Sequence, residues 1–159
     1  MSYSDIASRV LAARRLRYTL IVIDFVAVSL TLFALGVGLY MSLTHGLYRF
    51  AKAVLTLALP FALVSALRAL INAPRPAELC GLDAPGSRRG SSFPSRHVHS
   101  AFSIGTVLLF VSAPLGISVL LLGVCLGACR VLLGIHFPRD VIAGALTGSV
   151  TALIGMLIL

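Results

Sequence analysis

The chain has 159 residues, of which 58% are hydrophobic and only 11% charged, and its mean hydropathy is +1.03. A soluble domain of this length needs far more polar surface to cover its core, so the composition excludes that class and indicates one polytopic membrane domain. Thirteen basic residues against five acidic ones give a net charge of +8. Because a nucleic-acid-binding face needs a soluble scaffold, we expect anionic lipid or phosphate as the partner, and no nucleic acid.

The first 18 residues predict a separate segment. Four arginines are interspersed with aliphatic residues here. The arginines are Arg9, Arg14, Arg15 and Arg17, and the aliphatic residues are Ile6, Val10, Leu11 and Leu16. This spacing is typical of a short amphipathic helix lying on an anionic membrane surface, and a disordered basic tail is the alternative. We therefore expect an interfacial segment over residues 1–18 and a membrane-embedded domain over residues 19–159.

Five apolar runs follow, and each predicts a helix through the membrane. A helix needs about 20 apolar residues to cross the hydrocarbon core. The runs are Thr19–Tyr40, Phe50–Ile71, Val98–Val111, Leu115–Leu133 and Val141–Leu159. The predicted fold class is therefore all-α: a polytopic transmembrane helical bundle of about five spans, preceded by the amphipathic helix.

Details within these runs predict packing and turns. Asp24 is the only charge in the first run, so it either lies near the interface or braces an arginine elsewhere. Pro114 and Gly116 predict a tight turn before the fourth run. Glycines four residues apart in the fourth and fifth runs allow two helices to approach closely. These pairs are Gly123 with Gly127 and Gly144 with Gly148.

An odd number of spans fixes which connections share a membrane face. The N-terminus, the loop 72–93 and the turn 134–139 then lie together. This face carries all of the thirteen basic residues except Arg49 and Lys52. The positive-inside rule predicts that it is cytoplasmic, in a multi-pass protein of the cell membrane. The sequence predicts no oligomeric state.

Three short polar clusters interrupt the apolar sequence, at residues 68–76, 94–97 and 130–140. Charged side chains at membrane depth cost roughly 2.5–3.5 kcal/mol each on insertion scales, so such clusters indicate a function. The predicted topology brings all three clusters to one face. Four helix ends on that face can enclose a single pocket.

The residue types of these clusters are suited to binding phosphate. Ser95 is a suitable N-cap, which leaves the following backbone amides free to face an anion. Pro138 fits the first turn of the last helix, just after His136. Arginine adds fork-shaped donors that match phosphate oxygens. The clusters therefore predict a site for a phosphorylated lipid.

Two histidines and one carboxylate add catalytic chemistry to this site. His136 and Asp140 are four residues apart, so they share a face in helical geometry. A carboxylate that holds one ring nitrogen leaves the other nitrogen as a nucleophile. His97, from another helix end, is then placed to protonate the departing oxygen.

These residues resemble the three signatures of the type 2 phosphatidic acid phosphatases, which are Lys-x6-Arg-Pro, Pro-Ser-Gly-His and Ser-Arg-x5-His-x3-Asp. The matching segments here are Arg68-x6-Arg75-Pro76, Pro94-Ser95-Arg96-His97 and Cys129-Arg130-x5-His136-x3-Asp140. Order and spacing agree, and the resemblance covers the chain from Arg68 to its C-terminus.

The resemblance implies a lipid phosphatase that acts on a phosphomonoester or diphosphate of a lipid, including polyprenyl phosphates and diphosphates. It implies that His136 forms a phosphohistidine, that Asp140 orients it, and that His97 protonates the leaving group and later activates water. The phosphoryl oxygens are then held by Arg68, Arg75, Ser95, Arg96 and Arg130. No metal and no other cofactor is implied.

Three positions depart from the family pattern. Arg68 replaces lysine, Arg96 replaces glycine and Cys129 replaces serine. An inactive lipid-phosphate-binding scaffold therefore stays as an alternative, as does a lipid-phosphate transporter. The three cysteines lack paired-ligand spacing, so neither a disulfide nor a metal site is predicted from them. Arg88 and Arg89 form either a flexible basic loop or a contact for an anionic headgroup.

Overall fold

The structure is a computed structural model that describes residues 3–85 and 90–159. Arg88 and Arg89 lie outside the described residues. The described part contains seven helices and no strand, which confirms the all-α class. The helices are α1 (Tyr3–Ala12), α2 (Arg14–Thr44), α3 (Leu47–Ile71), α4 (Pro76–Cys80), α5 (Arg96–Leu109), α6 (Ala113–Leu132) and α7 (Pro138–Ile158).

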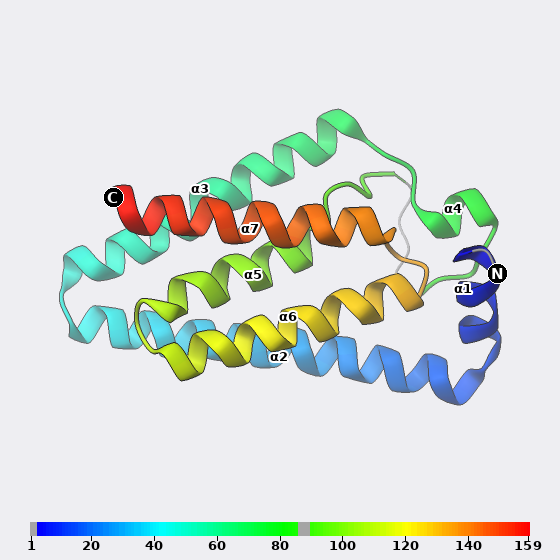
Figure 1. Ribbon diagram of the computed structural model, residues 1–159, viewed down its shortest axis with the longest axis horizontal. Coiled ribbons are helices and arrows are strands. Elements are labelled where there is room, and N and C mark those ends of the chain that lie inside the picture. Colours follow the sequence, from blue (N-terminus) through cyan, green and yellow to red (C-terminus); the bar gives the residue numbers. More distant parts are fainter. Residues whose placement is uncertain (1–2, 86–89) are drawn as a thin grey trace.

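All five predicted apolar runs form helices, and they pack side by side as one bundle (Figure 1). Four segments of the described chain are long and apolar enough to cross a membrane, and they contain α2, α3, α6 and α7. Helix α5 has 14 residues, about 21 Å at 1.5 Å per residue, and is shorter than a full span. Its inner position explains its burial, since it packs against α2, α3, α6 and α7.

Glycines on α7 allow α5 to approach closely. A Cβ atom built on Gly144 would lie 2.6 Å from the carbonyl oxygen of Ser95, and one on Gly148 would overlap the carbonyl oxygen of His99. This contact confirms the packing role predicted for the pair. It also fixes the start of α5 against the start of α7, which is where the second and third polar clusters lie.

Pro114 and Pro138 each lie in the first turn of a helix. Pro138 occupies the first turn of α7, as predicted. The tight turn predicted at Pro114 and Gly116 is wrong, because Pro114 lies in the first turn of α6 and Gly116 lies inside that helix. Proline fits a first helical turn since its missing N–H has no partner there. The turn itself is at residues 110–112.

Helix α1 packs on the end of the bundle next to α4 and the turn between α6 and α7 (Figure 1). Val10 belongs to a buried cluster that includes Leu20, Ala77 and Leu133. Helix α2 begins at Arg14, within the segment predicted to be interfacial. The location of α1 at a membrane surface stays a prediction.

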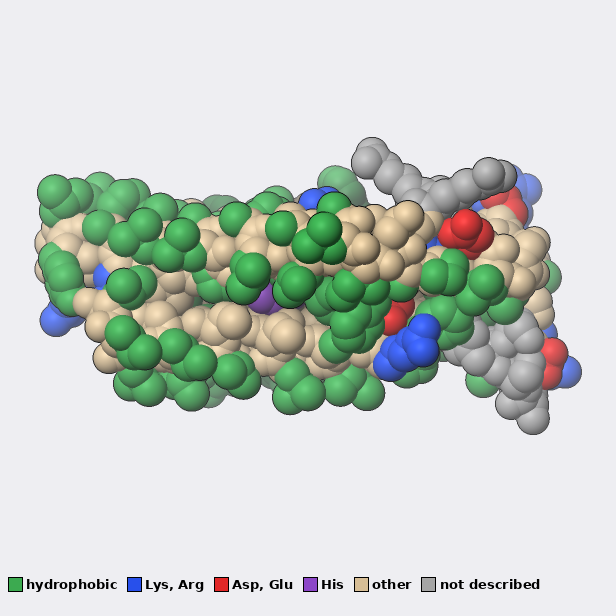
Figure 2. All heavy atoms as spheres, turned by 90° about the horizontal axis from the view of Figure 1, so that it is seen from above, with side chains coloured by type: hydrophobic (Ala, Val, Ile, Leu, Met, Phe, Trp, Pro, Cys, Tyr) green, Lys and Arg blue, Asp and Glu red, His purple; other side chains and the backbone are tan. Residues whose placement is uncertain are grey.

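Large apolar side chains cover the outside of the bundle, and the acidic side chains visible in Figure 2 lie toward the end that carries α1 and α4. Phe25, Phe33 and Leu70 are among the most exposed, at 70%, 71% and 81%. An apolar exterior on four spanning helices is suited to lipid surroundings. The loop before α5 and the turn between α6 and α7 lie toward one end, as predicted, while the C-terminus lies at the other (Figure 1).

Candidate active site

A polar pocket of about 370 Å³ lies where the three polar clusters meet. It is lined by Asp24, Arg68, Arg75, Pro85, Arg96, His97, Arg130, Ile135 and His136. All but two of the predicted site residues therefore line this one pocket. Those two are Asp140, which lies directly behind His136, and Ser95.

His136 is held from behind by a serine and a carboxylate. Its Nδ1 lies 3.4 Å from Ser92 Oγ and 3.7 Å from Asp140 Oδ2, and Ser92 Oγ donates to the same carboxylate oxygen at 2.5 Å. Because a carboxylate can only accept, the Ser92 hydrogen points toward it. Ser92 Oγ can then accept from Nδ1, and in that tautomer the lone pair of the imidazole is on Nε2.

The Asp140 carboxylate is fixed by the start of α7. Its Oδ2 also accepts from the backbone N–H of Phe137 at 3.1 Å, and the Arg139 Nε lies 3.7 Å from Oδ1. Asp140 is fully buried, and His136 is 2% exposed. A buried carboxylate with several donors holds its position, so it can set the orientation of the imidazole.

The surroundings of His136 favour its neutral form. Burial lowers the pKa of His136 below its usual value, and the nearby Arg75 and Arg68 lower it further. The Asp140 carboxylate opposes this shift without reversing it. A neutral imidazole is the form that can act as a nucleophile.

Arg130 joins two other pocket residues. Its Nε donates to Asp24 Oδ1 and its Nη2 donates to Asp24 Oδ2, both at 2.9 Å. Its Nη1 lies 3.2 Å from Nδ1 of His97. Of the two locations left open for Asp24, the structure shows the one in which it braces an arginine.

Arg68 and Arg75 hold the loop before α5. Arg68 donates to the carbonyl oxygens of Ser91, Ser92 and Pro94. Arg75 Nε donates to the carbonyl oxygen of Gly90 at 3.1 Å. Both side chains line the pocket, which places two guanidinium groups next to any anion bound there. The loop that carries Ser92 is thereby fixed against the end of α3.

Arg96 lies where the polar pocket meets an apolar groove. Its guanidinium is 5.6 Å from the centre of the Phe61 ring, a cation–π contact. Arg96 and His97 also line a second cavity of about 270 Å³, whose other walls come from α2, α3, α5 and α6. That cavity shares Leu32, Phe61 and Ile104, among others, with a third cavity of about 360 Å³. An apolar path therefore runs from the polar pocket along α5.

Ser95 and Cys129, which also belong to the matched motifs, lie outside the pocket lining. Ser95 is the N-cap residue of α5, as predicted, but its side chain makes no capping bond. Its Oγ is buried without a hydrogen-bond partner among the described residues. Cys129 is buried in the apolar cluster that holds Val10 and Leu133. The thiol therefore faces packing partners rather than the pocket.

Sequence reasoning missed Ser92. It lies in a Gly-Ser-rich loop, and nothing in its spacing separates it from Ser91, which has its own contact with Asn72. Only the folded loop shows that Ser92 bridges His136 and Asp140.

Comparisons with known proteins identify the family and the fold. The family model described as the PAP2 superfamily matches residues 33–159. The bacitracin transport permease protein BcrC of Bacillus licheniformis is 41% identical over 63 residues, which are 40% of this chain and 31% of that protein. The match thus spans about a third of that relative.

Two solved structures share the fold. The crystal structure of Aquifex aeolicus LpxE superposes with a TM-score of 0.73 at 27% identity, covering 96% of this chain and 93% of that one. The transmembrane PAP2-type phosphatidylglycerolphosphate phosphatase of Bacillus subtilis gives a TM-score of 0.69 at 21% identity, covering 97% and 82%. At that identity, the second likeness concerns the fold alone.

Proposed function

The chain belongs to the PAP2 superfamily, and on that premise we propose that it is a membrane lipid phosphatase that works through a phosphohistidine on His136. The observation that supports this most is the convergence of His97, His136 and four arginines on one pocket, with a buried carboxylate behind His136. Histidine nucleophile, proton donor and phosphate-binding cations are the three parts that phosphoryl transfer to an imidazole needs.

In the first half of the proposed reaction, the Nε2 lone pair of His136 attacks phosphorus. The bond between phosphorus and the lipid oxygen breaks, and its electron pair goes to that oxygen, which takes a proton from His97. Asp140 and Ser92 orient the attacking ring from its Nδ1 side. Four arginines stabilise the charge on the phosphoryl oxygens, namely Arg68, Arg75, Arg96 and Arg130. The motif resemblance implies the same role for Ser95, whose side chain lies outside the pocket lining.

In the second half, water attacks the phosphohistidine. The water proton goes to His97, which restores the proton that His97 gave up earlier. The bond between phosphorus and nitrogen breaks, its electron pair returns to His136, and inorganic phosphate leaves. The same two imidazoles therefore serve both halves, and no metal ion is part of the proposal.

The apolar path beside the pocket supports a lipid substrate. Arg96 and His97 line both the polar pocket and the adjoining cavity, so a phosphate bound at His136 has an apolar groove next to it. The exposed sides of the bundle are themselves apolar, which suits a substrate that arrives from the bilayer. We propose a lipid phosphate or a polyprenyl phosphate or diphosphate as the substrate, and the cytoplasmic face of the cell membrane as the site's location.

The test is release of inorganic phosphate from a lipid phosphate by the purified protein in detergent, with a metal chelator present. We expect release by the wild type and loss of release in His136→Ala. A panel of lipid phosphates identifies the substrate class. If the wild type binds these lipids but releases no phosphate, the protein is a lipid-phosphate-binding scaffold and the proposal is wrong.

A further inference from the structure

Asp24 takes part in the pocket although none of the three motifs contains it. It is the only acidic residue of α2, and it meets Arg130 of α6 through two parallel hydrogen bonds of 2.9 Å. The side chains of Arg130 and Asp24 are only 11% and 18% exposed. Such a bidentate pair fixes the plane of the guanidinium, which a single contact does not.

Stability of the fold does not account for this pair. Removing two charges from water is unfavourable, and apolar side chains of similar volume usually serve packing as well or better. A carboxylate at this depth of a spanning helix therefore indicates a function. The Asp24 carboxylate accepts two hydrogen bonds from Arg130, so we expect it to act through that residue.

The pair determines which nitrogen of Arg130 reaches His97. With Nε and Nη2 on Asp24, the nitrogen that contacts His97 Nδ1 is Nη1, at 3.2 Å. A guanidinium donates and never accepts, so Nδ1 of His97 is the acceptor in this contact. In the neutral ring the hydrogen then resides on Nε2, the nitrogen that remains for the pocket.

The two pocket histidines thus receive opposite tautomers. His136 has Nδ1 toward Ser92 and Asp140, which leaves a lone pair on Nε2. His97 has Nδ1 toward a donor, which leaves a hydrogen on Nε2. The first arrangement suits a nucleophile and the second suits a proton donor. One carboxylate stands behind each histidine, and the two carboxylates come from different helices.

We propose that Asp24 is a positioning residue that holds Arg130 so that His97 keeps the tautomer able to protonate the leaving oxygen. This inference rests on the proposed phosphatase function. Asp24 and Arg130 keep their own protons throughout. The neutral His97 ring gives its Nε2 hydrogen to the leaving oxygen and becomes an imidazolate, whose negative charge lies next to the Arg130 guanidinium on its Nδ1 side. The attacking water later returns a hydrogen to Nε2, which restores the neutral ring.

The first test is a double-mutant cycle of Asp24→Asn and Arg130→Gln, with kcat and KM measured for phosphate release. We expect Asp24→Asn alone to lower kcat about tenfold or more and to change KM less. In the Arg130→Gln background the same substitution is expected to change kcat less than about twofold. Additive losses would mean that Asp24 does not act through Arg130.

A matched control is Asp83→Asn. Asp83 also pairs with an arginine, Arg17, at 3.6 Å, but its side chain is 95% exposed and lies outside the pocket. The same chemical change there should leave kcat and KM at wild-type values. Thermal unfolding in detergent shows whether Asp24→Asn is folded. If it is not, Asp24→Glu replaces it, since this variant keeps the charge and moves it by one methylene.

The second test does not depend on turnover. Nitrogen-15 NMR of histidine-labelled protein distinguishes a protonated from an unprotonated ring nitrogen, and the His97→Gln variant identifies the His97 signals. We expect the Nε2–H tautomer in the wild type and a mixture in Asp24→Asn. An unchanged His97 tautomer in Asp24→Asn overturns the inference even when the wild type is an active phosphatase. A wild type that releases no phosphate overturns the proposed function, while the tautomer experiment still decides the role of Asp24.

Discussion

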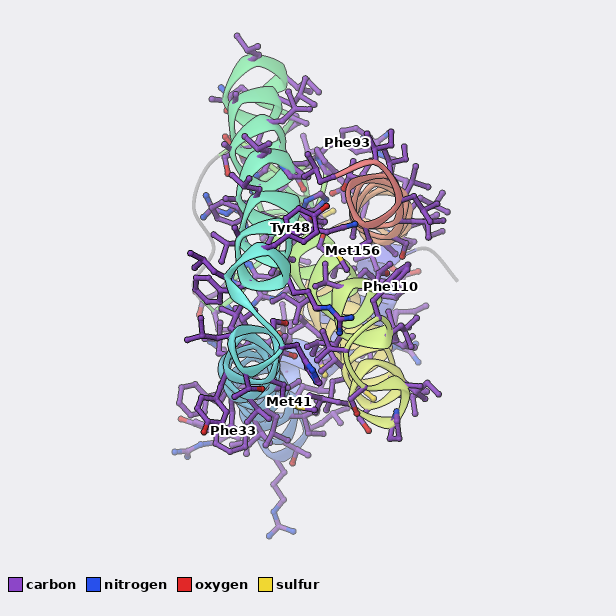
Figure 3. The ribbon with its side chains drawn as sticks, turned by 90° about the vertical axis from the view of Figure 1, so that its left-hand side faces the viewer. Phe33, Met41, Tyr48, Phe93, Phe110 and Met156 are labelled. Atoms are coloured by element: carbon purple, nitrogen blue, oxygen red, sulfur yellow. The ribbon has the colours of Figure 1, made fainter. Side chains whose placement is uncertain are left out.

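Both ends of the bundle carry basic side chains around a pocket, but only one end surrounds them with carboxylates and paired histidines. The far pocket, of about 290 Å³, is lined by Ser42, His45, Tyr48, Arg49, Lys52, Ala53, Phe110, Val111 and Met156. Figure 3 looks onto this end, where Tyr48, Met156 and Phe110 lie near one another. Among the described residues, no ion pair involves a member of this pocket.

Positive charge alone therefore does not distinguish the proposed active site from the far pocket. Near the membrane surface, lysine and arginine reach the headgroup region with their apolar stems in the bilayer, which explains Arg49 and Lys52 without further function. At the other end, each pocket histidine has a fixed neighbour on its Nδ1 side. Charge gathers an anion, whereas the fixed imidazoles can react with it.

The largest effect should come from removing the carboxylate behind His136. In Asp140→Asn, kcat for phosphate release should fall about a hundredfold or more, because general acid–base and orienting groups contribute on the order of 10²–10⁴. Binding of inorganic phosphate, measured by calorimetry, should change little. A variant with wild-type kcat would show that Asp140 does not orient the nucleophile.

A smaller effect is expected at the boundary between pocket and groove. Arg96→Ala removes one guanidinium from a pocket that keeps three others, and it also removes the contact with Phe61. We expect KM for the lipid phosphate to rise roughly tenfold with kcat nearly unchanged, since a single charge-assisted contact is worth about 1.5 kcal/mol. Steady-state kinetics on mixed micelles measures both, and an unchanged KM excludes a contact between Arg96 and the substrate.

The pH dependence of kcat/KM measures how the surroundings of His136 affect its pKa. The pKa of His136 lies below its usual value because of burial, so the neutral nucleophile should persist to a lower pH than a solvated histidine allows. Asp140 raises this pKa in opposition to burial. Replacing it with asparagine should therefore move the acid limb to lower pH. Ionisation of the substrate affects both proteins equally, so the difference between the two pH profiles reflects the pKa of His136. A shift of the acid limb to higher pH in Asp140→Asn would show that Asp140 does not raise this pKa.

The smallest effect is expected at the far end. Arg49→Ala and Lys52→Ala should leave kcat and KM within about twofold of wild type, because surface substitutions away from the reacting groups have small effects. Loss of turnover in either variant, with the protein folded, would mean that the far pocket takes part in the reaction.

Hydropathy and motif spacing predicted much of this molecule. The five apolar runs became five helices, and the arginine and histidine motifs met in one pocket because helix ends on one face of a bundle must be close. The third run predicted the existence of α5 but not its bounds, since the helix covers Arg96–Leu109 and the run covers Val98–Val111.

Other features depend on contacts that spacing does not encode. Ser92 bridges His136 and Asp140 only because the loop before α5 folds back to the start of α7. Arg68 turns toward carbonyl oxygens of that loop, a direction that the motif does not specify. The pairing of Asp24 with Arg130 joins residues 106 positions apart and follows from the packing of α2 on α6.

The most direct measurement of the central claim is the site of phosphate attachment during turnover. His97 serves both halves, so His97→Ala is combined with a phosphate ester whose leaving group needs no protonation. The first half should then proceed while the second slows, so a substrate labelled in its phosphoryl group should leave its label on the protein. We expect peptide mapping to find this label on His136. The double variant with His136→Ala and His97→Ala should carry no label. A label on another residue, or phosphate release without any labelled protein in the single variant, would contradict it.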